Sequence, residues 1–138
     1  MTVDLEALNF KRVRLMWALQ ALAMPANVQV TLYPDFVRKT DELALEFEEH
    51  FEGFLSTLAG ELTGQRWGAL KAVDDKLNAM SREGPKFSEA LWEDDALESS
   101  QEWATLRNLA GEALTELGWP IESPPQDPRD RGSIYVGG

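Results

Sequence analysis

The chain has 138 residues, enough for one domain with a hydrophobic core, and 43% of them are hydrophobic, which argues against an intrinsically disordered chain. A formal net charge of −11 argues against direct binding of nucleic acid or an anionic membrane through a broad basic face. The lack of cysteine excludes disulfides, thiolate nucleophiles and zinc–thiolate sites.

Residues 4–24 have the spacing of a helix with two apolar faces, which Pro25 ends. One face carries Leu5, Leu8, Leu15, Leu19, Leu22 and Ala23, and the opposite face carries Phe10, Val13, Trp17 and Met24. Such a helix is either central in its domain or covered by another chain. Phe10, Val13 and Trp17 are therefore the candidate residues for self-association in a homodimer.

The start of the chain is acidic where a signal peptide would be basic. No apolar stretch approaches the roughly 20 residues that a helix needs to cross a bilayer. We therefore expect a soluble, cytoplasmic protein without a membrane partner.

Residues 28–33 alternate apolar and polar side chains, which predicts either a short strand or an extended connector. Residues 133–136, Ser-Ile-Tyr-Val, would be the second strand of a minor two-stranded β element.

Three longer helices and one short helix follow. Pro34 and Asp35 open a helix that reaches about residue 62, and a further helix covers about 65–81. A short helix follows Gly84-Pro85, and Ser99 with Glu102 has the form of a capping box for the last helix. Gly118, Trp119 and Pro120 end that helix.

The fold class is therefore all-α: a single-domain bundle of four to five helices over residues 1–120. Residues 121–138 are rich in proline and form a C-terminal tail that we expect to be flexible or draped over the surface.

The acidic residues fall into two blocks. Residues 41–62 hold seven carboxylates and no Lys or Arg, and residues 89–116 hold eight carboxylates against Arg107 alone. Like charges repel, so such segments need water, cations or a basic partner around them.

The first block contains Glu48, Glu49 and Glu52, three carboxylates at helical spacing that could hold Mg²⁺. This string is similar to the EExxE helix of the all-α nucleotide pyrophosphatases, the dimeric dUTPase and MazG-like group. The resemblance implies a Mg²⁺-dependent hydrolase of nucleotides with these three residues as metal ligands. The ExxD pair with which those enzymes complete the metal site does not occur in this chain. The alternative interpretation is a solvated helix face.

The second block places Glu93, Asp94 and Asp95 directly after Trp92. Acid beside an exposed aromatic side chain is typical of a docking patch, because aromatic anchors contribute much of the binding energy of interfaces. The alternative interpretation is that Trp92 packs inward and the carboxylates are solvated.

These observations favour a small acidic, non-catalytic protein–protein interaction module of the inhibitor, immunity-protein or antitoxin type, which docks a partner with a basic surface. The partner-binding candidates are Glu48, Glu49, Glu52, Trp92, Glu93, Asp94 and Asp95. On this hypothesis the protein has no catalytic residue, metal or cofactor. The alternatives are the Mg²⁺-dependent hydrolase and a homo-oligomeric structural or adaptor protein.

Overall fold

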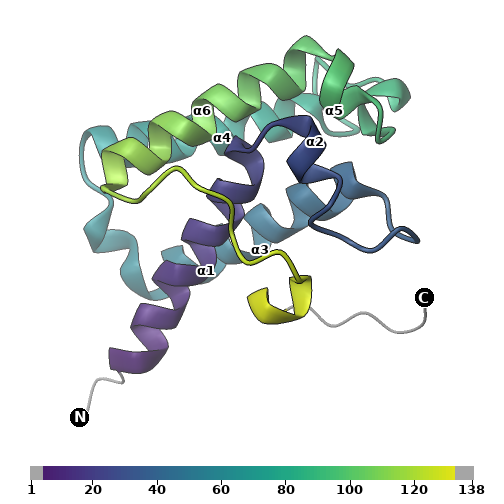
Figure 1. Cartoon of the computed structure of the whole chain (residues 1–138). Coiled ribbons are helices and arrows are strands. Elements are labelled where there is room, and N and C mark those ends of the chain that lie inside the picture. The colour runs from purple at the N-terminus through teal and green to yellow at the C-terminus, as the bar shows by residue number, and fades with distance from the viewer. Residues whose placement is uncertain (1–4, 133–138) are drawn as a thin grey trace.

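The computed structural model describes residues 5–132 and shows an all-α domain (Figure 1). The long helices are α1 (Leu5–Ala23), α3 (Lys39–Leu58), α4 (Gln65–Met80) and α6 (Gln101–Leu117). The short elements are α2 (Ala26–Gln29), η1 (Ala59–Glu61), η2 (Glu89–Trp92), α5 (Ala96–Ser99) and η3 (Pro128–Arg131). The predicted helical bundle is confirmed. No helix in the described part of the chain is long and apolar enough to span a membrane.

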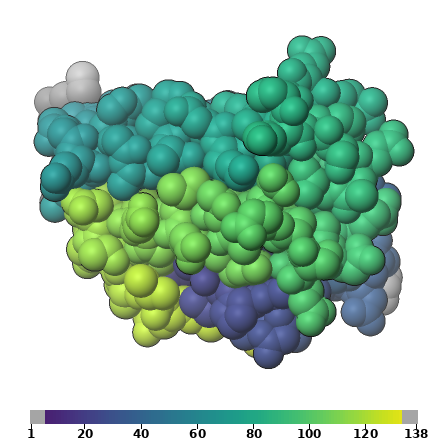
Figure 2. Space-filling view, turned by 90° about the horizontal axis from the view of Figure 1, so that it is seen from above, coloured from purple at the N-terminus to yellow at the C-terminus, as the bar shows by residue number. Residues whose placement is uncertain are grey.

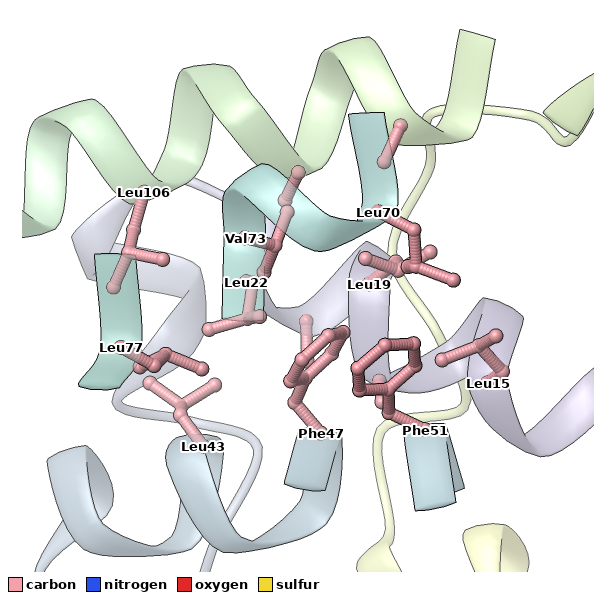
Figure 3. Close-up of a cluster of buried hydrophobic side chains, with 14 of the residues drawn as sticks. Leu15, Leu19, Leu22, Leu43, Phe47, Phe51, Leu70, Val73, Leu77 and Leu106 are labelled. Atoms are coloured by element: carbon pink, nitrogen blue, oxygen red, sulfur yellow. The ribbon is translucent and has the colours of Figure 1, made fainter. Parts of the chain in front are cut away.

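The long helices form two layers. α4 and α6 lie side by side and antiparallel in one layer, and residues 81–99 lie at the end where the two helices are joined (Figure 2). α1 packs against α6 above it and against α3 beside it. Side chains from all of these helices meet between the layers, including Leu19 and Leu22 of α1, Phe47 of α3, Val73 of α4 and Leu106 of α6 (Figure 3).

α1 is the central helix over its C-terminal half. Leu15, Leu19 and Leu22 are fully buried, and Gln20 on the same half is also buried and donates a hydrogen bond to the Pro120 carbonyl. The second apolar face is buried at its C-terminal end and exposed near its N-terminal end: Met24 is buried, whereas Phe10 is 52% exposed. The first of the two expected explanations, a central position in the domain, therefore accounts for the C-terminal half of this helix.

Residues 28–33 form neither of the two predicted structures, a short strand or an extended connector. Residues 26–29 form the helical turn α2, and a further turn follows to residue 33, so the described residues 5–132 contain no strand. Gln29 explains the difference: its buried side-chain amide donates to the carbonyls of Ala21 and Leu22 and thereby caps the end of α1. The proposed partner strand, residues 133–136, lies outside the described residues.

Two helix starts also differ from the prediction. α3 begins at Lys39, four residues after Asp35, and α6 is capped by Ser100, whose hydroxyl accepts a hydrogen bond from the Trp103 backbone N–H at 3.1 Å. The capping box was therefore placed one residue too early. The end of α6 is as predicted: Gly118 has a φ of 74°, and the Trp119 N–H donates to the Leu114 carbonyl.

The described part of the C-terminal tail crosses α1 and ends against α3 (Figure 1). Arg131 of η3 is fully buried, and its Nε donates to Oε1 of Glu46 at 3.0 Å while Nη2 donates to the Leu32 carbonyl. The Tyr33 hydroxyl donates to the other oxygen of Glu46, and the guanidinium lies over the Tyr33 ring. This buried Glu46 cluster (Tyr33, Glu46 and Arg131) joins three distant segments. The flexibility of the tail stays a prediction.

We expect Arg131→Ala to lower the free energy of unfolding by about 3 kcal/mol, because it leaves the Glu46 carboxylate buried without its cation. Arg129→Ala is the matched control: its side chain is 75% exposed beside Asp127, so the loss should be below about 1 kcal/mol. Urea denaturation measures both. Equal losses would show that the cluster does not hold the tail in place.

Candidate functional site

The orientation of α3 sets the first wall of the candidate site. Leu43, Phe47 and Phe51 are buried in the core. Their burial turns Asp41, Leu45, Glu48 and Glu52, which follow one another at intervals of four, three and four residues, toward the outside. Leu45 is an apolar residue on this acidic face and is 56% exposed.

The second wall is the segment that joins α4 to α5. Trp92 in η2 is partly buried: its indole N–H donates to the Met80 carbonyl at 2.9 Å, and its ring lies edge-on to that of Trp103. The backbone carbonyl of Trp92 accepts a hydrogen bond from the Thr40 hydroxyl at 2.6 Å. These contacts hold the segment beside the first turns of α3.

A groove of about 620 Å³ lies between the two walls. We call it the α3 groove. Asp41, Ala44, Leu45 and Glu48 line it from α3, and Phe87, Glu89, Trp92 and Glu93 line it from the opposite wall. Two cations, Arg38 and Arg82, also line the groove. Arg38 lies 3.9 Å from Glu93, and the Arg82 guanidinium lies over the Phe87 ring. Carboxylates therefore outnumber cations around an apolar strip.

The α3 groove brings together Glu48, Trp92 and Glu93 from the two predicted acidic blocks. The other candidates lie elsewhere. Glu49 lines a separate hollow beside His50, and Glu52 is exposed on α3 beyond the groove. Asp95 precedes α5 and lines a depression next to Glu98. The structure thus assembles part of the predicted docking surface in one place.

Asp94 has a structural role. Its Oδ1 accepts a hydrogen bond from the Lys39 backbone N–H at 2.8 Å, and its Oδ2 lies 3.7 Å from Lys39 Nζ. The first N–H groups of a helix have no partner within the helix, so this carboxylate caps α3 from a distant segment.

The carboxylates of the EExxE string do not gather at one point. Glu48 and Glu49 line different hollows. Within residues 5–132 there is no group of three or more His, Cys, Asp or Glu side chains placed to bind a metal ion. The geometry therefore gives the Mg²⁺-dependent hydrolase no support.

The hollow beside His50 is smaller, about 290 Å³, and is lined by Phe10, Arg14, Glu49 and Phe54 among others. Burial lowers the pKa of the His50 imidazole below its ordinary value, and the positive charge of Arg14 acts in the same direction. Glu49 and Glu46 oppose this shift. His50 thus flanks the core.

The face proposed for self-association exposes only part of its apolar side chains. Val13 and Trp17 are partly buried, and the Arg14 guanidinium covers one side of the Phe10 ring at 4.1 Å from its centroid. Self-association through these residues stays a hypothesis.

Comparison with protein-family models, with curated proteins and with solved structures finds no match to this chain.

Sequence reasoning did not include Leu45 and Phe87 among the site residues. Leu45 carried a usable signal, since it is a large apolar residue outside the apolar stripe of its helix. Phe87 carried none, because the turns around Gly84 and Pro85 that place it have no periodic pattern.

We expect Asp94→Ala to lower the free energy of unfolding by about 1 kcal/mol through loss of the cap on α3. Glu93→Ala changes the neighbouring exposed carboxylate and should cost less than about 0.5 kcal/mol. Thermal or urea denaturation of the two variants distinguishes these roles. If they lose equal stability, Asp94 is not the cap.

We expect NMR titration to give His50 a pKa below its usual value of about 6.5. The folded state disfavours the imidazolium. The protein therefore has its full stability above the pKa that His50 has in the unfolded chain, and it loses stability as the pH falls from that value toward the lower pKa of the folded state. Glu49→Gln should lower the pKa further, because it removes an attractive charge. A midpoint at or above 6.5 would contradict this account.

Proposed function

We propose that this protein is a non-catalytic interaction module that docks a basic surface of another protein in the α3 groove. The proposal rests on one observation: Glu48, Trp92 and Glu93 line the same groove as the exposed side chain of Leu45. An aromatic or aliphatic centre with charged residues at its edge is the arrangement of protein-binding surfaces.

The charges of the groove indicate the kind of partner. Carboxylates from both walls produce a negative potential in a concave surface, which attracts a basic protein and speeds its association. Burial of Leu45 beside Trp92 would add the apolar contact that slows dissociation. By analogy, small acidic inhibitors that cover a basic cleft work in this way. We place this activity in the cytoplasm.

The decisive experiment compares two double charge reversals in capture of proteins from the native source. Glu48→Lys with Glu93→Lys changes the groove, whereas Glu112→Lys with Glu116→Lys makes the same change in charge on the exposed face of α6. We expect the groove variant to reduce capture about tenfold and the α6 variant to reduce it little.

Raising the salt concentration should also weaken capture by the unchanged protein. Salt screens the attraction between charges, because the Debye length falls from about 10 Å at 0.1 M to about 3 Å at 1 M. A captured protein counts as the partner only if the groove variant loses it and the α6 variant retains it. Equal retention by both variants would refute the proposal.

A further inference from the structure

We propose that the α3 groove receives an amphipathic α-helix of the partner, with one apolar side chain seated on Leu45 and basic side chains about one turn before and after it. This inference rests on the proposed function, and it narrows the partner from a basic surface to a helix of defined pattern.

The pattern follows from the α3 wall. Asp41 lies four residues before Leu45 and Glu48 lies three residues after it, and all three line the groove. Residues at these spacings are neighbours on one helix face, about 5–6 Å apart. Ala44, which also lines the groove, has a small side chain that lets another backbone come close. A matching helix therefore carries Lys or Arg, an apolar residue, and Lys or Arg at intervals of three or four.

The opposite wall supplies the same two kinds of side chain, apolar and acidic. Phe87 and Trp92 supply apolar surface, and Glu89 and Glu93 supply carboxylates. The indole of Trp92 is fixed by its hydrogen bond to Met80 and by its contact with Trp103, so its position need not be ordered on binding. A helix seated on Leu45 would meet apolar surface and carboxylates on both sides, while Arg38 faces Glu93 and Arg82 lies over Phe87.

A helix fits better than an extended segment. The α3 wall is helical, so its backbone groups bond within the helix. On the other wall, the N–H groups of Leu91 and Glu93 donate to the carbonyls of Ser88 and Ala90. Addition of a strand requires a row of free backbone groups, whereas a helix binds through side-chain pockets and charges.

The test uses two designed peptides of about 18 residues, long enough to form helix in water. Both contain the same numbers of Ala, Lys and Leu. The patterned peptide has its leucines on one face with lysines three and four residues away, and the shuffled peptide distributes the leucines around the helix. Circular dichroism checks that both have equal helix content, and fluorescence anisotropy measures binding to the full chain.

We expect the patterned peptide to bind at least about tenfold more tightly than the shuffled one, since only it places leucine and flanking lysines together on the face that meets Leu45, Asp41 and Glu48. Leu45→Ser should remove this difference. Ile121→Ser, a change at another exposed apolar residue that does not line the groove, should preserve it.

The inference is overturned if the two peptides bind equally or if the patterned peptide does not bind. It is also overturned if Leu45→Ser leaves the affinity for the patterned peptide unchanged. The reversal pair Glu48→Lys with Glu93→Lys separates the two levels of the account. If the two peptides bind equally but this variant weakens the binding of both, the proposal of basic docking in the groove is kept and the proposed helix pattern is refuted. If they bind equally and this variant changes neither, the proposed function falls as well.

Discussion

The apolar stripe of α3 has to be buried in the core that this helix shares with α1, α4 and α6, and this requirement fixes the direction of its other side chains. Phe47 and Phe51 stack on one another within that core. Because a helix rotates by a fixed angle per residue, their burial places Leu45 and Glu48 on the outer face. The α3 groove is thus a consequence of packing, and its acidic wall cannot turn away without exposing the phenylalanines.

The same rotation buries Glu46, which is the exception among the carboxylates of the first block. A buried carboxylate is costly unless it is paired and hydrogen-bonded. Arg131 and Tyr33 meet that requirement and in doing so bring the C-terminal segment across the central helix α1. Asp94 has a comparable role at the start of α3, where it joins the helix to the second wall of the groove. Each acidic block therefore contains a carboxylate that joins distant segments, Glu46 in the first and Asp94 in the second, beside others that face outward.

Local patterns predicted the helices and the glycine cap at Gly118, because helical periodicity and a left-handed residue depend only on near neighbours. The prediction of a strand or extended connector at 28–33 was wrong, because this segment turns so that Gln29 donates hydrogen bonds to backbone carbonyls of α1. Alternation of side chains does not reveal such a contact. The pairing of Glu46 with Arg131 spans 85 residues and has no sequence signal. For the site, the sequence identified Glu48, Trp92 and Glu93 separately, but only the fold shows that they line one groove.

We propose above all that the α3 groove is the surface through which this protein binds its partner. Hydrogen exchange of the chain, alone and in complex with the partner captured from the native source, tests it most directly. Binding of a partner shields the backbone amides beneath it and stabilises the segments that it contacts. The account predicts slower exchange in residues 41–48 and 81–93 on complex formation, with little change in residues 8–17. Slower exchange confined to residues 8–17 or to the exposed face of α6, with the groove unchanged, would contradict it.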